Sequence, residues 1–177
     1  MPANWRRYPP WGAIVSWTIV ALVLWRLYIY QPATSVLPAE GLDTRVVRVV
    51  DGDTLLIEQG HRIRLLGVDT PETKHPNRPA EPWGAEASAF TRDLIEGREV
   101  RLEFDRERQD RYGRWLAYVF VDGVMLNELL IRQGYSRAEI RFPFRSDRQR
   151  LFQKAEQAAR EEGLGIWSGE SPVVATE

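Results

Sequence analysis

Two short acidic motifs stand where the pattern of strands does not require charge. The motif VVDGDT carries Asp51 and Asp53 around a glycine, and the motif RLLGVDTPET carries Asp69 and Glu72. Asp-Gly is common in hairpin turns, so the first motif taken alone indicates only a turn. The second motif could cap a helix, but the next helical pattern begins about a dozen residues later, so capping does not explain it.

These carboxylates can meet at one edge of a sheet. Asp53 opens the second of three predicted strands, and Asp69 and Glu72 lie just beyond the third. In an antiparallel meander, the start of one strand and the end of the next share an edge. Converging oxygen ligands without histidine or cysteine favour Ca²⁺ or Mg²⁺. We therefore expect a divalent cation near these side chains.

Two arginines accompany the carboxylates. Arg64 lies on the third predicted strand, and Arg114 opens a later strand after the turn QDRYG. Each could be an ordinary solvated charge, but beside a cation two guanidinium groups can clamp a phosphate in its trigonal-bipyramidal state. The metal would polarise a phosphoryl oxygen, and Glu72 can take a proton from water. Together these residues predict phosphodiester hydrolysis; glycoside hydrolysis would explain neither the arginines nor the metal.

Composition narrows the possible functions. The chain has 177 residues and a net charge of −1 from 24 basic and 25 acidic residues, so bulk charge does not indicate a nucleic-acid binder. It has no cysteine and two histidines. Disulfides, cysteine-ligated metals, thiol catalysis and a three-histidine metal site are therefore excluded.

Short strands followed by helices are expected to position the reactive residues. Strands are predicted over residues 44–51, 53–59, 61–67, 98–104 and 114–121. Helices are predicted over 85–96, over 124–133 and from Asp147, as a capping residue, to 162. Five strands in a meander with three helices indicate an α+β fold built on a small β-barrel of the five-stranded OB-fold type.

The first part of the chain has a different composition. Residues 11–25 carry no charge, and the apolar run continues to residue 30 with only Arg26 inside it. Twenty helical residues span about 30 Å, the thickness of a bilayer core. Basic residues precede the run and none follow it directly, which predicts a cytoplasmic N-terminus. A cleaved signal peptide, which would leave a secreted domain, and a buried core helix are the alternatives.

The predicted domain organisation follows from this division. It comprises a cytoplasmic segment, a transmembrane signal-anchor helix, a linker, the barrel domain and a tail, at residues 1–10, 11–30, 31–43, 44–168 and 169–177. The barrel domain is then expected outside the cytoplasm, attached to the membrane by the N-terminal helix. We expect the protein to be a monomer.

Six motifs taken together resemble the staphylococcal nuclease, or thermonuclease, family. They are VDGDT, RLLGVDTPETKHP, GAEASAF, DRYGRWLAYVFVDG, LIRQGY and GLGIWS, and they occur in the family's order. The resemblance implies a five-stranded OB barrel with three helices. It also implies a Ca²⁺-dependent nuclease that cleaves single-stranded DNA, RNA and, less readily, duplex DNA, leaving 3′-phosphates.

The resemblance further implies a role for each matching residue. Ca²⁺ ligands correspond to the Asp53 and Asp69 side chains and the Thr70 backbone carbonyl, and the general base corresponds to Glu72. The phosphate-stabilising arginines correspond to Arg64 and Arg114, and further phosphate contacts correspond to Arg111 and Tyr112.

One departure from the family concerns the nucleotide pocket. Ile140 and Phe142 stand where the family's best-known member has two tyrosines. Phe142 can still stack on a base, but neither side chain can donate a phenolic hydrogen bond to phosphate. The arginines between residues 141 and 150 are the only local basic concentration, which indicates either a solvated helix start or a groove for the nucleic-acid backbone.

Two other functions compete with the enzyme. One is a catalytically inactive nuclease-like module that binds nucleic acid or protein at the membrane, and the other is a structural membrane protein. An inactive module would be expected to lose part of the catalytic set, whereas this chain keeps Asp53, Arg64, Asp69, Glu72 and Arg114. Charge at a sheet edge also argues against a scaffold, so the sequence favours the enzyme.

Overall fold

The computed structural model describes residues 41–73, 79–169 and 172, which all belong to one compact unit, Pro38–Glu177. The predicted cytoplasmic segment and transmembrane helix, and all but the last residues of the predicted linker, lie outside the described residues. Among the helices that are described, none has the length and apolar character needed to cross a bilayer.

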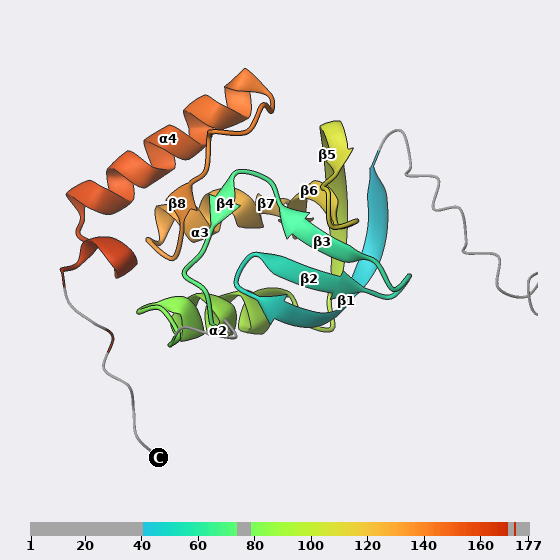
Figure 1. Cartoon of the computed structure of the whole chain (residues 1–177), viewed down its shortest axis with the longest axis horizontal. Helices are drawn as coiled ribbons and strands as arrows, with labels where there is room; N and C mark the ends of the chain where they lie inside the picture. Colours follow the sequence, from blue (N-terminus) through green and yellow to red (C-terminus); the bar gives the residue numbers. More distant parts are fainter. Residues whose placement is uncertain (1–40, 74–78, 170–171, 173–177) are drawn as a thin grey trace, which may run out of the picture. The chain divides into compact units, whose positions relative to one another are not determined.

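Five strands close into a barrel. They are β1 (Leu42–Asp51), β2 (Thr54–Ile57), β3 (Arg62–Leu65), β5 (Glu99–Gln109) and β6 (Trp115–Val121). Neighbours pair antiparallel in the order β3-β2-β1-β5-β6, and a parallel pairing of β3 with β6 closes the ring. The predicted five-stranded barrel with three helices is confirmed (Figure 1).

Strand β5 illustrates how the strands contribute to the barrel core. On β5, Val100 and Leu102 are buried, whereas the neighbouring Glu99 and Arg101 are exposed. A period of two places every second side chain on the same face of a strand. The apolar faces of all five strands therefore point into one core, which is filled by fully buried residues that include Val46, Leu55, Ile63, Leu102 and Val119.

The turn after β6 corrects one predicted helix boundary. Asp122 and Gly123 have φ angles of 49° and 80°. Positive φ at both central residues is what a type I′ hairpin turn requires. The chain therefore returns along β6 as β7 (Val124–Met125), and α3 (Leu126–Arg132) begins two residues later than predicted. The apolar run of this segment masked the short strand at its start.

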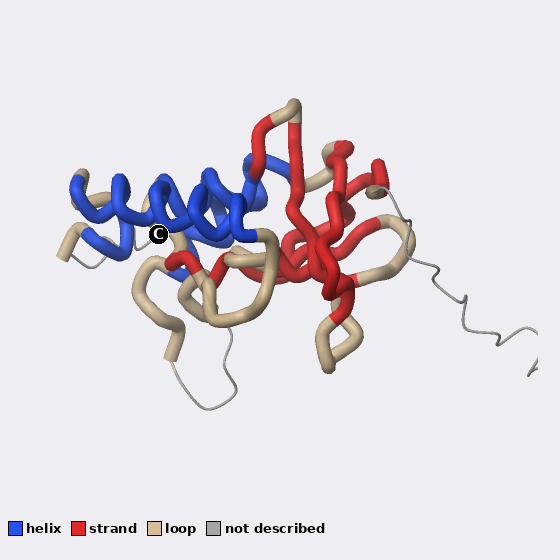
Figure 2. The backbone as a smooth tube through the Cα atoms, turned by 90° about the horizontal axis from the view of Figure 1, so that it is seen from above, coloured by secondary structure: helices blue, strands red, loops and turns tan. Residues whose placement is uncertain are grey.

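Three helices cover the barrel on one side. Helix α2 (Gly84–Ile95) contacts β1, and α3 contacts both β6 and α4 (Ser146–Glu161). The last helix among the described residues is the short η1 (Gly165–Trp167). Figure 2 shows the strands gathered at one end of this unit, with the helices at the other.

The predicted cap of α4 is wrong. Asp147 lies inside the helix and forms an ion pair with Arg145 at 2.8 Å, and no side chain caps this helix. The backbone N–H of Arg145 instead donates to the Asp105 carboxylate on β5, at 2.8 Å. The helix therefore starts where a buried barrel residue holds it, which no local pattern in the sequence indicates.

A small second sheet brings a late segment beside the acidic motif. Strand β4 (Val68–Asp69) pairs antiparallel with β8 (Arg137–Ala138). The pairing continues through a hydrogen bond from the Glu139 N–H to the Gly67 carbonyl at 3.0 Å. Gly67 has a φ of 71°, and a Cβ there would lie 2.6 Å from the Phe152 ring. Only glycine fits this crossing beneath α4.

Candidate active site

The predicted reactive residues surround one cavity of about 300 Å³. Its lining residues are Asp51, Asp53, Thr54, Arg64, Asp69, Thr70, Glu72, Glu81 and Arg114. They come from the end of β1, from β2, β3, β4 and the loop that follows, and from the residue before β6. The structure thus brings together every residue that the sequence predicted for catalysis or for metal binding.

Strand register explains why they meet. Thr54, which follows Asp53, pairs with Arg64 across β2 and β3, and the Leu65 N–H donates to the Asp53 carbonyl at 3.0 Å. Arg64 also lies opposite Leu116 in the parallel pairing of β3 with β6. Because side chains alternate along a strand, Arg114 lies on the same face as Leu116. Closure of the barrel therefore places the second arginine beside the first.

Asp53 is the most buried carboxylate of the cavity, with 5% of the residue exposed. It accepts hydrogen bonds from the Thr54 hydroxyl at 3.0 Å, the Thr70 N–H at 3.2 Å and the Thr70 hydroxyl at 3.0 Å. It also forms an ion pair with Arg64 Nη1, while Arg64 Nη2 lies 3.4 Å from Asp69 Oδ1. Arg64 therefore bridges the two predicted metal-binding carboxylates.

The two arginines act on each other electrostatically. Burial lowers the pKa of Arg64, and the positive charge of Arg114 lowers it further, while Asp69 and Asp51 oppose the shift. The ordinary pKa of an arginine is so high that Arg64 remains a cation at neutral pH. Two neighbouring cations repel, and an anion placed between them would relieve that repulsion. The pair is thus arranged for a phosphate group.

Asp110 holds the second arginine, and sequence reasoning missed it. Its carboxylate accepts hydrogen bonds from Arg114 Nε at 2.7 Å, from the Arg114 N–H at 3.0 Å and from the Tyr112 N–H at 2.9 Å. Burial opposes the charge of Asp110, but these hydrogen bonds hold its pKa below the ordinary value. The turn motif QDRYG was the available signal, because an aspartate at the start of a turn often binds the backbone ahead of it.

Asp51 ties the acidic loop to the barrel and to α2. It accepts hydrogen bonds from the Gly52 N–H, the Thr73 hydroxyl and the Ser88 hydroxyl, each at 2.9 Å. Burial would raise its pKa, but hydrogen bonding involving Glu72 and these three donors lowers it. Asp51 therefore supports the segment that carries Glu72. In the sequence, Gly52 separates Asp51 from Asp53.

Glu81 is a second residue that the sequence did not indicate. Its N–H donates to the Glu72 carbonyl at 2.9 Å, and its carboxylate accepts from the Glu72 N–H at 3.3 Å. These two bonds fix the backbone of Glu72 at the cavity. Glu81 follows a proline-rich loop with no periodic pattern, so no local signal could have identified it.

A larger cavity of about 450 Å³ adjoins the first and shares Arg64 and Arg114 with it. Its wall includes Arg111, Tyr112 and Phe142. Phe142 is 63% exposed, so its ring is accessible to a ligand. Tyr112, at 68% exposed, instead has the Arg111 and Arg114 guanidinium groups over its ring. The Arg111 guanidinium lies 4.8 Å from the Tyr112 ring centroid. The structure thus gathers the predicted phosphate and base contacts beside the two arginines.

The donor chemistry of the smaller cavity fits a hard divalent cation. Its five carboxylates outnumber its two guanidinium groups, and every available donor is oxygen, which Ca²⁺ prefers. Among the described residues, no group of three or more His, Cys, Asp or Glu side chains is already arranged around a metal position. Asp53 and Asp69 are instead joined through Arg64. The Ca²⁺ ligands therefore stay a prediction.

The fold and the site define an OB-fold protein suited to binding phosphate esters. The sequence matches the family described as staphylococcal nuclease homologue over residues 62–169. It is 46% identical to the thermonuclease of Staphylococcus intermedius over 126 residues, which cover 69% of this chain and 74% of the relative. It is 42% identical to the thermonuclease of Staphylococcus hyicus over 127 residues, with 70% and 75% covered.

A third relative comes from another genus. The endonuclease YncB of Bacillus subtilis is 41% identical over 125 residues, which cover 68% of this chain and 59% of the relative. The chain thus belongs to the staphylococcal nuclease family and is a hydrolase of the nuclease class.

Proposed function

We propose that the protein is a Ca²⁺-dependent, sugar-non-specific nuclease that hydrolyses DNA and RNA to 3′-phosphate products. In this proposal Glu72 activates the attacking water, and Arg64 and Arg114 clamp the scissile phosphate. The observation that carries the proposal is the single cavity that all three side chains line together with Asp53 and Asp69.

The two guanidinium groups stabilise the charge that develops on the phosphate. Arg114 is held by Asp110, which is not a proposed cation ligand, so its side chain need not reorganise during the reaction. Arg64 is held by Asp53 and Asp69, and it becomes available to the phosphate when the cation takes these carboxylates. Preorganised donors of this kind act mainly on the transition state, where negative charge on the phosphoryl oxygens is greatest. The mutual repulsion of the two cations strengthens this preference, because a more highly charged phosphate relieves it best.

Glu72 takes the proton from water. Its backbone is fixed on both sides by Glu81, and its side chain interacts with Asp51. A carboxylate at a polar cavity can act as a general base toward water. Its place in the same cavity as the arginines allows one water to reach both Glu72 and a clamped phosphate.

Asp53, Asp69 and the Thr70 carbonyl supply the ligands for Ca²⁺ in this proposal. A cation held there would supply Lewis-acid chemistry, polarising a phosphoryl oxygen and adding positive charge to the site. The carboxylates of this cavity are in excess over its guanidinium groups, which supports cation binding. Hydrogen bonds from Thr54 and Thr70 hold the Asp53 carboxylate in its orientation, whether it faces Arg64 or the cation.

The adjoining cavity binds the nucleotide. Phe142 offers an exposed aromatic face on which a base can stack, and Arg111 and Tyr112 line the same cavity for phosphate contacts. Stacking requires a base that is free of its partner strand. Single-stranded DNA and RNA are therefore the favoured substrates, and duplex DNA is cleaved less readily.

We also propose a location outside the cytoplasm. The charge-free run of residues 11–25, with basic residues before it, supports an N-terminal membrane anchor. A nuclease without sequence specificity would attack the nucleic acids of its own cytoplasm, so export is the consistent arrangement. Mapping the N-terminus by mass spectrometry of the membrane and secreted fractions distinguishes an anchor from a cleaved signal.

The test is cleavage of a fluorescent single-stranded DNA by the full-length chain. Ca²⁺ and then Mg²⁺ are titrated, with a chelator as the negative control and analysis of the product ends. We expect Ca²⁺-dependent cleavage to 3′-phosphates that is lost in Glu72→Gln and retained in the matched control Glu58→Gln, whose exposed side chain lies outside both cavities. A folded protein that binds DNA without cleaving it would instead support an inactive binding module.

A further inference from the structure

Arg141 differs from Arg145 and Arg148, two other arginines near the start of α4. Arg145 is paired with Asp147, and Arg148 lies 3.6 Å from Glu103 and over the Tyr118 ring. The Arg148 side chain is therefore occupied in linking the helix to the barrel, and the Arg145 side chain in an ion pair within the start of the helix. Arg141, in contrast, has a side chain that is 81% exposed.

Glu139 anchors this exposed arginine from one side only. Arg141 Nε lies 2.9 Å and 3.0 Å from the two carboxylate oxygens of Glu139, Arg141 Nη2 also donates to Glu139, and the Arg141 N–H donates at 3.0 Å. The Glu139 side chain is only 12% exposed, so the anchor is fixed in the protein. One edge of the guanidinium is therefore oriented, while the Nη1 side makes no hydrogen bond to any described residue.

This pair lies at the rim of the proposed site. Glu139 lines the larger cavity together with Arg64 and Arg114, and its N–H is bonded to Gly67, two residues before Asp69. The hydrogen bonds to Arg141 lower the pKa of Glu139, and Arg64 lowers it further; Arg141 in turn has a raised pKa, first from Glu139 and also from Asp69. Glu139 and Arg141 are thus electrostatic neighbours of the phosphate clamp and of the predicted metal ligands.

We propose that Arg141 is a further phosphate-binding residue, which contacts the phosphate flanking the scissile one in a single-stranded polynucleotide. This inference rests on the proposed function. A strand whose scissile phosphate lies between Arg64 and Arg114 must leave the cavity across its rim, where Arg141 presents a free guanidinium edge. Guanidinium groups bind phosphate through paired hydrogen bonds, and an arginine oriented in advance loses less entropy on binding.

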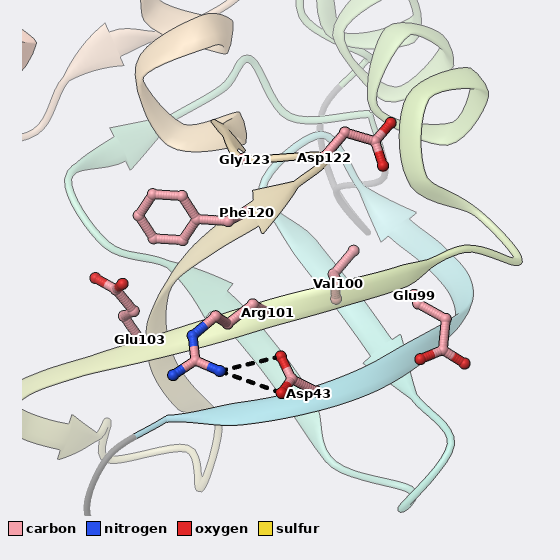
Figure 3. Close-up of a pocket in the computed structure, with 8 residues that line it drawn as sticks. All are labelled: Asp43, Glu99, Val100, Arg101, Glu103, Phe120, Asp122 and Gly123. Carbon is pink, nitrogen blue, oxygen red and sulfur yellow. Dashed lines mark hydrogen bonds and ion pairs between the residues drawn. The ribbon is translucent and has the colours of Figure 1, made fainter.

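The first test is binding, with a matched control elsewhere on the barrel. Arg101 is also an exposed arginine paired with one carboxylate, Asp43, and it lines a separate cavity that shares no residue with the proposed site (Figure 3). Affinity for a fluorescent single-stranded octanucleotide is measured at several salt concentrations, with Glu72→Gln present in every protein to prevent cleavage.

We expect Arg141→Gln to weaken octanucleotide binding about tenfold and to reduce the slope of log K against log salt by about 0.7, because one phosphate contact is lost. Arg101→Gln is expected to change neither quantity. Equal effects of the two substitutions would overturn the proposal, because they would show that only net charge matters.

Glu139→Gln separates positioning from simple charge. This substitution removes a negative charge near the substrate, so electrostatics alone predicts tighter binding. If Glu139 orients Arg141, binding becomes weaker instead, although the protein is more positive. Tighter binding in Glu139→Gln would show that the acid only repels the substrate, and would overturn the positioning role.

The cleavage assay distinguishes this proposal from the nuclease mechanism. In an otherwise unmodified chain, Arg141→Gln should raise KM about tenfold for the octanucleotide and leave kcat unchanged. The same variant should leave a dinucleoside monophosphate, which has no flanking phosphate, unaffected; equal losses on both substrates would contradict the proposal. If the unmodified chain cleaves neither substrate, the proposed mechanism fails, while the binding measurements still decide the role of Arg141.

Discussion

Two cavities of similar size hold similar residues but have different properties. The proposed active site, of about 300 Å³, and the cavity of Figure 3, of about 320 Å³, each contain several carboxylates and arginine. In the proposed site, the side chains of Arg64 and Asp53 are 20% and 8% exposed. In the other cavity, those of Arg101 and Asp43 are 50% and 68% exposed. Residue composition alone therefore does not identify a site.

The difference lies in how the charges are held. Water screens the Arg101–Asp43 pair and competes for its hydrogen bonds, so the pair is weak and adaptable. Asp53 is instead surrounded by donors from Thr54 and Thr70 as well as Arg64, in a place where charges interact more strongly. Fixed, partly desolvated charges can stabilise a transition state without first reorganising. Four sets of substitutions test this comparison.

The largest effect is expected from removal of a clamping arginine. Arg64→Gln should lower kcat/KM about a hundredfold or more, because one preorganised donor to the phosphate is lost. Arg114→Gln, which leaves Asp53 paired, should have a similar effect and guards against a folding defect in the first variant. Steady-state kinetics with circular dichroism as a folding check measures both. A loss of less than tenfold in both variants would contradict the clamp.

The second prediction concerns Asp105, a buried carboxylate that stabilises the fold but lies outside the proposed active site. Asp105 is 8% exposed, and it accepts hydrogen bonds from the Tyr118 hydroxyl at 2.6 Å and from the Arg145 N–H at 2.8 Å. Burial would raise its pKa, but these bonds lower it. Asp105→Asn should therefore reduce the free energy of unfolding by about 2 kcal/mol at neutral pH. It should leave kcat/KM of the folded protein unchanged, because Asp105 lies outside both site cavities.

The pH dependence of this variant has a definite sign. A carboxyl group with a lowered pKa in the folded state stabilises the protein above its unfolded pKa, near 3.9, and loses that contribution as pH falls through the folded value. Urea unfolding of Asp105→Asn and the unmodified chain should therefore converge below about pH 4. A difference that stays constant with pH would contradict the assigned role, and the exposed Asp43→Asn serves as the control.

A smaller effect is expected where the substrate base stacks. Phe142→Ala should raise KM for single-stranded DNA about tenfold, since base stacking on an aromatic ring contributes about 1–3 kcal/mol. Val124→Ala, at another exposed apolar side chain, is the matched control. A substrate that lacks the base at the cleavage position should be insensitive to Phe142→Ala. An equal loss on that substrate would exclude stacking as the cause.

The smallest effect is expected in the second cavity. A double-mutant cycle on Asp43 and Arg101 should give a coupling below about 1 kcal/mol that decreases with salt, as exposed ion pairs do. Neither substitution should change kcat/KM. A strong coupling or a kinetic effect would show that the two cavities are more alike than their exposure indicates.

Much of the fold was predictable because it depends on local patterns. Runs of β-branched and aliphatic residues between turn glycines indicated the first three barrel strands, alternation of apolar and polar residues indicated the other two, and glycines indicated the ends of the helices. The failures occurred where tertiary contacts overrule local preference: Val124–Met125 pairs with β6 although its pattern resembles a helix, and α4 starts where Asp105 holds Arg145 rather than at a cap on Asp147.

The reactive residue types, and the meander that brings Asp53 and Asp69 to one sheet edge, could be predicted from the amino-acid sequence. Which arginine reaches these carboxylates, and what holds each group in place, depends on tertiary contacts. Arg114 joins Arg64 because β3 and β6 pair in parallel, and Asp110, Glu81 and Glu139 complete the surroundings. Strand closure across some fifty residues depends on how the whole core packs, so no short stretch of sequence can encode it.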